Sequence, residues 1–137
     1  MSEVYVLDAC ALIAVLKNED GADSVAAAYE KANAGQAQLI MNRVNLFEVY
    51  YGFYREKGKE YADHIIDNVK RSAVTISEFD DSIFEVAGRL KSTFHISLAD
   101  SIALAQAVAS GGSLLTADHH ELDTVEAAGD IKFLWIR

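Results

Sequence analysis

A continuous apolar run near the start of the chain limits the folds that it can adopt. Residues Val4 to Leu7 lead without a break into Asp8, and a helix-forming stretch of small and apolar residues follows at once. Such a run is typical of a strand buried on both faces, as in the middle of a parallel sheet. The chain is therefore expected to be an α/β protein organised around this strand.

Helical and strand-like segments alternate along the rest of the chain. Further strands are expected at residues 38–41, 74–76, 113–116 and 132–136. Helices are expected at residues 9–16, 22–34, 43–56, 61–71, 80–94 and 97–110, and a short helical turn followed by a helix at 125–128 precedes the last strand. Strands separated by helices predict a single α/β domain over residues 1–137, with a central, mostly parallel sheet of about four to five strands and helices on both faces.

Composition and charge narrow the functional class. The single cysteine, Cys10, cannot form an internal disulfide, no signal-peptide pattern is present, and no apolar run approaches the roughly 20 residues that span a bilayer. A cytoplasmic protein with no membrane partner is expected. The net charge of −9 argues against a protein that coats nucleic acid without sequence preference, which would normally be basic. A nuclease is not excluded, because bound divalent ions offset a cluster of carboxylates.

Four acidic residues stand at corresponding positions of the predicted fold. Asp8 ends the first strand, Glu48 lies one turn into the helix after the second strand, Asp100 is in the first turn of the 97–110 helix, and Asp118 follows strand 113–116. The carboxyl ends of parallel strands open onto one edge of a sheet, so these acids are expected to converge there. Hard oxygen ligands without cysteine or paired histidine suit Mg²⁺ or Mn²⁺ rather than zinc.

Each acid also has a local explanation. Asp8 could simply cap the helix that follows it, and Asp118 could cap the turn before Leu122. Ser97 and Asp100 fit a capping box, and Glu48 could be a solvated helix residue. The caps explain the acids one by one, whereas a metal site explains the set. For His119 and His120, a surface turn or a hydrogen bond to Asp118 is expected rather than metal ligation, because metal-binding histidines usually have spaced partners.

The chain resembles the PIN-domain ribonucleases, and among them the VapC-type toxins of toxin–antitoxin pairs. The resemblance covers essentially the whole chain and rests on four motifs in the family's order, at residues 6–14, 45–52, 97–105 and 114–120. It implies that Asp8, Glu48, Asp100 and Asp118 are the catalytic, metal-binding acids. It also implies an endoribonuclease that hydrolyses RNA phosphodiester bonds with Mg²⁺ or Mn²⁺, a cognate antitoxin as partner, and a homodimer.

The same resemblance assigns supporting positions and shows departures from the family pattern. Thr116 matches the hydroxyl residue that the family often carries two places before its last acid. Asn45 stands three residues before the second acid, where the family favours Ser or Thr. Ala9 and Cys10 follow the first acid, where the family usually has Thr or Ser in one of the two positions.

Two sets of residues could contact RNA or a protein partner. Phe47, Tyr51 and Tyr54 form a second aromatic stripe on the helix that carries Glu48, and core packing is the alternative explanation. The basic residues Arg55, Lys57 and Lys91 could follow a phosphate backbone, with a solvated surface as the alternative. A catalytically silent PIN-like module that only binds a protein partner remains the alternative for the chain as a whole.

Overall fold

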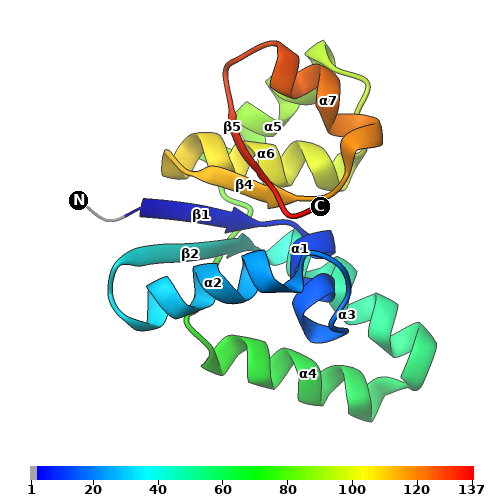
Figure 1. The fold of residues 1–137 in the computed structure, drawn as a ribbon. Coiled ribbons are helices and arrows are strands. Elements are labelled where there is room, and N and C mark those ends of the chain that lie inside the picture. The colour runs from blue at the N-terminus through cyan, green and yellow to red at the C-terminus, as the bar shows by residue number, and fades with distance from the viewer. Residues whose placement is uncertain (1–2) are drawn as a thin grey trace.

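A five-stranded sheet, parallel throughout, forms the centre of the molecule (Figure 1). The computed structural model describes residues 3–137. The strands are β1 (Glu3–Leu7), β2 (Ala37–Asn42), β3 (Val74–Ser77), β4 (Ser113–Thr116) and β5 (Lys132–Trp135), in the order β3-β2-β1-β4-β5. The apolar run at the start of the chain is therefore the central strand, and the predicted fold class is confirmed.

Helices cover both faces of the sheet. The helices α1 (Ala9–Leu16), α2 (Ala22–Asn33), α3 (Arg43–Lys57) and α4 (Lys59–Arg71) lie on one face in Figure 1. The helices α5 (Asp81–Thr93), α6 (Leu98–Ser110) and α7 (His119–Ala127) lie on the other. The chain crosses to the second face after β3, so the sheet is wound in two directions from β1, and its carboxyl edge between β1 and β4 is a point where such folds bind ligands.

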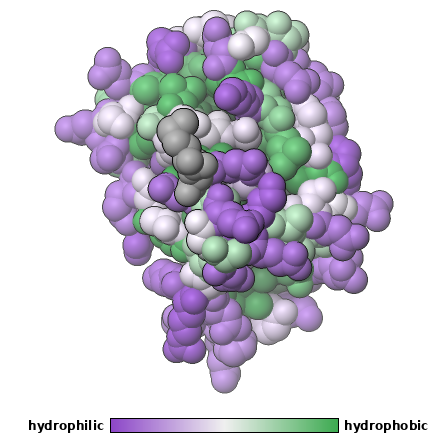
Figure 2. Space-filling model, turned by 60° about the vertical axis from the view of Figure 1, so that its left-hand side comes forward, coloured by the Kyte–Doolittle hydropathy of each residue, from purple (hydrophilic) through white to green (hydrophobic). Residues whose placement is uncertain are grey.

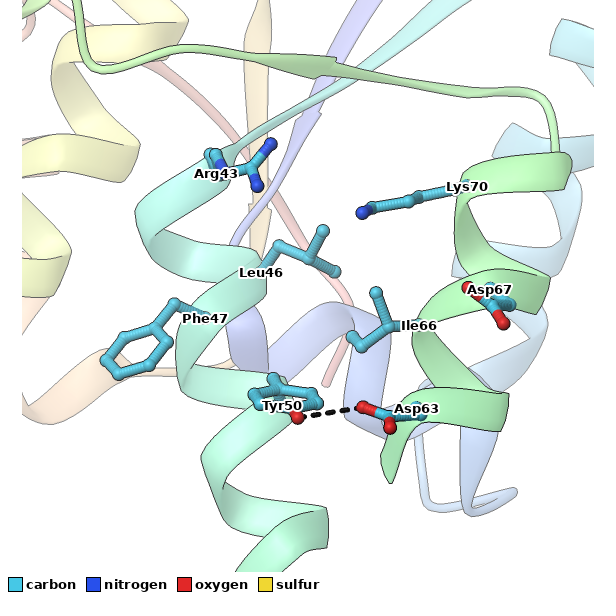
Figure 3. Close-up of a pocket in the computed structure, with 8 residues that line it drawn as sticks. All are labelled: Arg43, Leu46, Phe47, Tyr50, Asp63, Ile66, Asp67 and Lys70. Carbon is cyan, nitrogen blue, oxygen red and sulfur yellow. Dashed lines mark hydrogen bonds between the residues drawn. The ribbon is translucent and has the colours of Figure 1, made fainter. Parts of the chain in front are cut away.

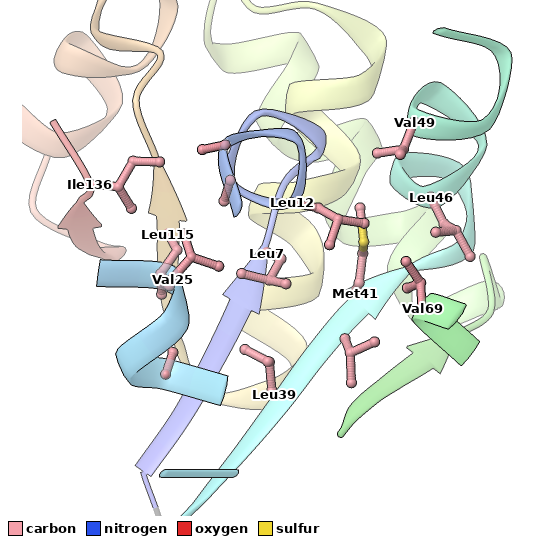
Figure 4. Packing of buried hydrophobic residues seen from close by; sticks show 14 of the residues in the cluster. Leu7, Leu12, Val25, Leu39, Met41, Leu46, Val49, Val69, Leu115 and Ile136 are labelled. Carbon is pink, nitrogen blue, oxygen red and sulfur yellow. The ribbon is translucent and has the colours of Figure 1, made fainter. Parts of the chain in front are cut away.

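The two faces bury separate apolar cores. In β1, Leu7 packs into the core beneath α1–α4, while Val6 packs into the core beneath α5–α7. Both side chains are inaccessible to solvent. Figure 4 shows the first core, with Leu7 between Leu12 of α1 and Leu39 of β2. Each such side chain contributes about 1.5–3 kcal/mol on burial, so the strand that ends at Asp8 is firmly held.

One predicted segment is wrong. Residues 119–127 form a single helix rather than a turn followed by a helix at 125–128. Asp118 caps this helix, and Leu122 and Val125 lie on its buried side, so the helical spacing already begins at Asp118. The polar residues His119 and His120 suggested a turn, but they occupy the solvent-exposed first turn of α7.

The α3–α4 connection is tighter than expected. Helix α4 begins at Lys59 instead of residue 61, and Gly58 alone separates it from α3. Gly58 has φ +89°, a left-handed conformation that residues with a side chain rarely adopt. The two helices consequently lie side by side as a hairpin. The outer side of α4 is largely hydrophilic along the lower part of the face shown in Figure 2.

No helix within residues 3–137 is long and apolar enough to cross a membrane.

Candidate metal site

Asp8 combines the two roles considered for it. It is the N-cap of α1, and its Oδ1 accepts a hydrogen bond of 2.8 Å from the Ala11 amide. The residue is buried at the carboxyl end of β1, beside the end of β4. Because a carboxylate has two oxygens, the cap leaves Oδ2 available to the interior of the site.

Asp100 completes only half of the predicted capping box. Ser97 caps α6 as expected, with its hydroxyl oxygen accepting a hydrogen bond of 3.1 Å from the Asp100 amide. The return bond comes from elsewhere, because the Ser97 amide donates to Glu121 Oε2 over 3.4 Å. The Asp100 carboxylate is left free, and its buried Oδ2 has no hydrogen-bond donor among the described residues. A buried carboxylate oxygen without a donor requires a cation or a proton.

Asp118 and Glu121 bring two more carboxylates to the same place. The Asp118 amide donates to the buried Thr116 hydroxyl over 3.1 Å, which holds the end of β4 in position. Asp118 Oδ1 in turn accepts from the Glu121 amide over 3.4 Å. One carboxylate oxygen each from Asp100, Asp118 and Glu121 lie within 4.8 Å of one another. These three acids could hold a metal ion.

Glu121 was not among the predicted site residues. The spacing of Asp118 and Glu121 matches a helix start, in which a capping acid is followed three residues later by glutamate. A single helix from residue 119 would have placed Glu121 in its first turn, at the carboxyl edge of the sheet. Because a separate turn is expected here from the sequence, Glu121 is not assigned to a helix start and is not predicted as a site residue.

The four predicted acids and Glu121 line one cavity of about 180 Å³. Glu48 reaches it from α3, half-buried and outside the group of three acids. Asn45 ties α3 to this edge, because its Nδ2 donates to the Ala99 carbonyl of α6 over 3.0 Å. The remaining lining residues are Ala9, Cys10 and Ser97.

No basic side chain is among the described residues that line the cavity, and its carboxylates are hard to ionise. Burial raises the pKa of Asp8 to about 6, and the Asp118 and Glu48 carboxylates add to that rise against the opposing effects of Thr116 and the Ala11 amide. Burial, together with Glu121 and Asp118, raises the pKa of Asp100 to about 9. Burial also raises the pKa of Glu48, which the Asn45 side chain partly offsets. Without a cation, Asp100 therefore retains its proton at neutral pH.

A divalent cation fits this donor set. The ligand atoms offered are carboxylate oxygens from separate elements, and a cation among them would replace the retained proton and satisfy Asp100 Oδ2. Cys10 adds a thiol at the wall, but burial and the neighbouring Asp8 raise its pKa, which disfavours the thiolate that metals bind. The site accordingly favours hard oxygen-binding cations.

His119 is not a metal ligand in this arrangement. Its Nδ1 lies 2.8 Å from Asp123 Oδ1 and its Nε2 lies 2.9 Å from the Arg137 carbonyl oxygen. Both partners are acceptors, so both ring nitrogens donate, and neither is free to bind a cation. The expected hydrogen bond from a histidine ring to Asp118 is not found for His119. His120 is exposed beside it.

The aromatic and basic residues singled out in the sequence lie outside the cavity. Phe47 is 59% exposed, and Tyr51 and Tyr54 are exposed on the same helix, so core packing does not explain them. The Arg55 guanidinium lies 5.5 Å from the Tyr51 ring centroid. Lys57 lies over the Tyr61 ring, and Lys91 donates to the Ile96 carbonyl, bracing the segment before α6.

Comparison with known families agrees with this architecture. The model of the PIN domain family matches residues 5–127. The chain belongs to the PIN domain family. The resemblance drawn from the four sequence motifs is therefore confirmed at the level of the family.

Several solved structures share the fold of this PIN domain. VapBC2 from Rickettsia felis, bound to a DNA fragment from its promoter, superposes with a TM-score of 0.76 at 19% identity, over 96% of this chain and 98% of that one. VapBC-1 from nontypeable Haemophilus influenzae superposes with a TM-score of 0.73 at 17% identity, over 97% of this chain and 98% of that one. VapC20 from Mycobacterium tuberculosis is a toxin that cleaves the sarcin–ricin loop. It superposes with a TM-score of 0.64 at 14% identity, over 93% of this chain and 95% of that one. Comparison with curated protein sequences gives no significant match.

Proposed function

We propose that this PIN domain is a Mg²⁺- or Mn²⁺-dependent endoribonuclease and the toxin of a toxin–antitoxin pair. The observation that carries the proposal is the buried Asp100 Oδ2, which has no donor and lies among the carboxylates of Asp8, Glu48, Asp118 and Glu121. Among these carboxylates Asp100 can be ionised only at a high cost, and a cation would remove that cost by pairing with the buried oxygen. The similarity of the whole chain to VapC-type structures also supports the proposal of a ribonuclease toxin.

Each acid has a distinct part in holding the ion. Asp100 would bind it directly through its buried Oδ2, and Asp8, which is buried and lines the same cavity but lies outside the group of three acids, is assigned as the second direct ligand. Asp118, Glu121 and Glu48 would complete the ligand set directly or through water. A bound divalent cation lowers the pKa of its water and neutralises charge on a phosphodiester, which is the chemistry needed for hydrolysis. Thr116 and Asn45 act one step away, holding Asp118 and the start of α6 in place.

The first experiment measures hydrolysis of a single-stranded RNA by the pure protein in Mg²⁺, in Mn²⁺ and in EDTA. Asp8→Asn should abolish cleavage, whereas the matched change Asp23→Asn, in the exposed first turn of α2, should leave it intact. Equal cleavage by wild type and Asp8→Asn would show that a contaminating nuclease produced the signal. Absence of cleavage, combined with no effect of Mg²⁺ or Mn²⁺ on thermal stability, would favour the catalytically silent module.

The antitoxin is proposed to bind the groove between α3 and α4. This groove has a volume of about 440 Å³ and is shown in Figure 3. Leu46 and Ile66 form its apolar floor, and Arg43 and Lys70 face each other near one end (Figure 3). Such a groove accepts an amphipathic helix, whose apolar side covers the floor while its acidic residues meet the basic end. An arginine or lysine from the same partner could enter the acidic cavity.

A homodimer is proposed through the exposed stripe of α3. Phe47 and Tyr51 pack edge to face with ring centroids 5.4 Å apart, and both are open to solvent. Aromatic residues of this kind are enriched in the centres of protein interfaces. Sedimentation analysis of the wild type against Tyr51→Ser tests the assignment: the wild type should sediment as a dimer and the variant should dissociate at lower concentration.

A further inference from the structure

Three aromatic rings form a stacked group, here called the column, at the start of α7 and along β5. Trp135 stacks with both of the other rings, with its centroid 5.2 Å from that of Phe133 and 3.8 Å from that of His119. The interplanar angles are 8° and 17°, so the rings are stacked. Phe133 and Trp135 are partly buried, whereas His119 is the exposed, outermost ring of the column.

The orientation of the outermost ring is fixed by hydrogen bonds. His119 donates from both ring nitrogens, to Asp123 and to the Arg137 carbonyl, and Trp135 Nε1 donates to Glu126 over 2.8 Å. The inner face of His119 lies against Trp135, yet 48% of the His119 side chain is exposed. The exposed part is therefore mainly the outer face of the ring. A ring held in this way offers a flat surface without losing rotational freedom on binding.

The column stands at the rim of the candidate metal site. His119 directly follows Asp118, whose carboxylate belongs to the acidic group. The His119 ring is bound to Arg137 at the C-terminal end, which lies beside α1 in Figure 1. The His119 ring is thereby attached one residue away from a carboxylate of the acidic group.

We propose that a nucleobase of the RNA strand stacks on the outer face of His119 and thereby positions the strand at the cavity. This inference rests on the proposed ribonuclease function. Unpaired bases stack on aromatic side chains, histidine included, and stacking needs no basic residues. That matters here because the domain carries a net charge of −9, and the basic residues Arg55, Lys57 and Lys91 lie outside the cavity.

The experiment compares RNA binding by matched variants in an inactive Asp100→Asn background. Fluorescence anisotropy of a labelled single-stranded RNA is measured for His119→Ala and for His120→Ala, its exposed neighbour outside the column. His119→Ala should weaken binding about tenfold, within the range measured for single stacked bases, and His120→Ala should change it less than twofold. In the active protein, His119→Ala should raise KM more than it lowers kcat, because stacking is lost from ground state and transition state alike.

Two further variants separate stacking from hydrogen bonding. His119→Phe keeps a ring but loses both donors, so it should retain much of the RNA affinity. His119→Gln keeps a donor but has no ring face, and it should bind as weakly as His119→Ala. The reverse order would overturn the stacking proposal. Thermal unfolding of each variant verifies that the fold is intact.

Failure of this inference can be distinguished from failure of the proposed function. If the wild type cleaves RNA while His119→Ala and His120→Ala bind it equally well, the stacking platform is wrong and the ribonuclease assignment stands. If wild type neither binds nor cleaves RNA, both are wrong. Selective loss of affinity on His119→Ala, with rescue by His119→Phe, supports the platform.

Discussion

The acidic cavity and the α3–α4 groove differ in how well the protein satisfies its own polar groups. The groove is the larger of the two, at about 440 Å³ against about 180 Å³. Its carboxylate Asp63 accepts a hydrogen bond of 2.8 Å from the Tyr50 hydroxyl and pairs with Lys59. In the cavity, Asp100 Oδ2 is buried without a donor, and its neighbours are other carboxylates. The proposed metal site is therefore the smaller of the two hollows, and incomplete hydrogen bonding rather than size distinguishes it.

The pKa values of a groove carboxyl, Asp63, and of a cavity carboxyl, Asp100, are shifted in opposite directions. Lys59 and Tyr50 hold the pKa of Asp63 below its ordinary value, so the fold stabilises the ionised form of this carboxyl group. Burial and neighbouring acids hold the pKa of Asp100 at about 9, so the fold destabilises its ionised form. A carboxylate kept in an unfavourable state by its surroundings is a candidate for ligand binding. The groove is instead suited to a partner that covers it.

The largest effect is expected from removing a ligand of the ion. Asp100→Asn should lower kcat/KM for RNA cleavage by about 1000-fold, since several kcal/mol of transition-state stabilisation depend on the bound ion. Asp63→Asn, the matched change in the groove, should alter kcat/KM less than twofold. Steady-state cleavage of a fluorogenic RNA measures both. Comparable losses in the two variants would remove the distinction between cavity and groove.

Cation binding should stabilise the fold through the cavity alone. Mn²⁺ at about 100 times its Kd should stabilise the native state by about 2.7 kcal/mol, which raises Tm by about 8 °C for a domain of this size. The rise should be absent in Asp100→Asn, present in Asp63→Asn, and reversed by EDTA. Differential scanning calorimetry measures the shift. A full rise in Asp100→Asn would mean that the ion binds elsewhere.

Removing a basic side chain from the groove should affect the partner and not the chemistry. Lys70→Ala should weaken binding of the antitoxin, the small protein expected to be encoded beside this gene, by about tenfold, which is about 1.4 kcal/mol. RNA cleavage by the isolated variant should be unchanged, because Lys70 lines the groove and not the acidic cavity. Calorimetric titration with that protein provides the measurement. Unchanged antitoxin affinity would contradict the assignment of the groove to this partner.

Removing one charge from each region should change the stability of the metal-free protein in opposite directions. The pKa of Asp100 is higher in the folded than in the unfolded chain, so ionising it costs stability progressively as pH rises from about 4 to about 9. In EDTA at pH 8, Asp100→Asn should be more stable than wild type by about 1 kcal/mol, and the difference should shrink toward pH 5. Urea titrations at both pH values measure it.

The groove residue should behave in the reverse way. The pKa of Asp63 is lower in the folded chain, so its ionised form adds stability above the unfolded pKa, and this is lost as pH falls through the folded value. Asp63→Asn should therefore be slightly less stable than wild type at pH 8, with the difference disappearing in acid. The same sign for both variants would contradict the contrast between the two regions.

Much of the fold and most of the candidate site could be predicted from local patterns. The run from Val4 to Leu7 is the central strand, and the alternation of strands with helices predicts the parallel sheet. Asp8 and Asp118 were predicted because each stands between a strand end and the helix that follows, and Asp100 because it lies in the first turn of a helix. These positions are visible in the sequence itself. Glu48 was found in the same way, one turn into its helix. These features depend on residues only a few places apart.

Only the tertiary structure decided which strand ends and helix starts lie next to one another. The strand order places β4 beside β1, so Asp118 comes to the edge that Asp8 occupies. The start of α7 comes against the start of α6, which joins Glu121 to Ser97 and Asp100. Trp135 stacks on His119 because β5 runs parallel to β4, returning the chain to the same edge. No local pattern encodes these contacts, since they join segments distant in sequence through the packing of the sheet and its helices.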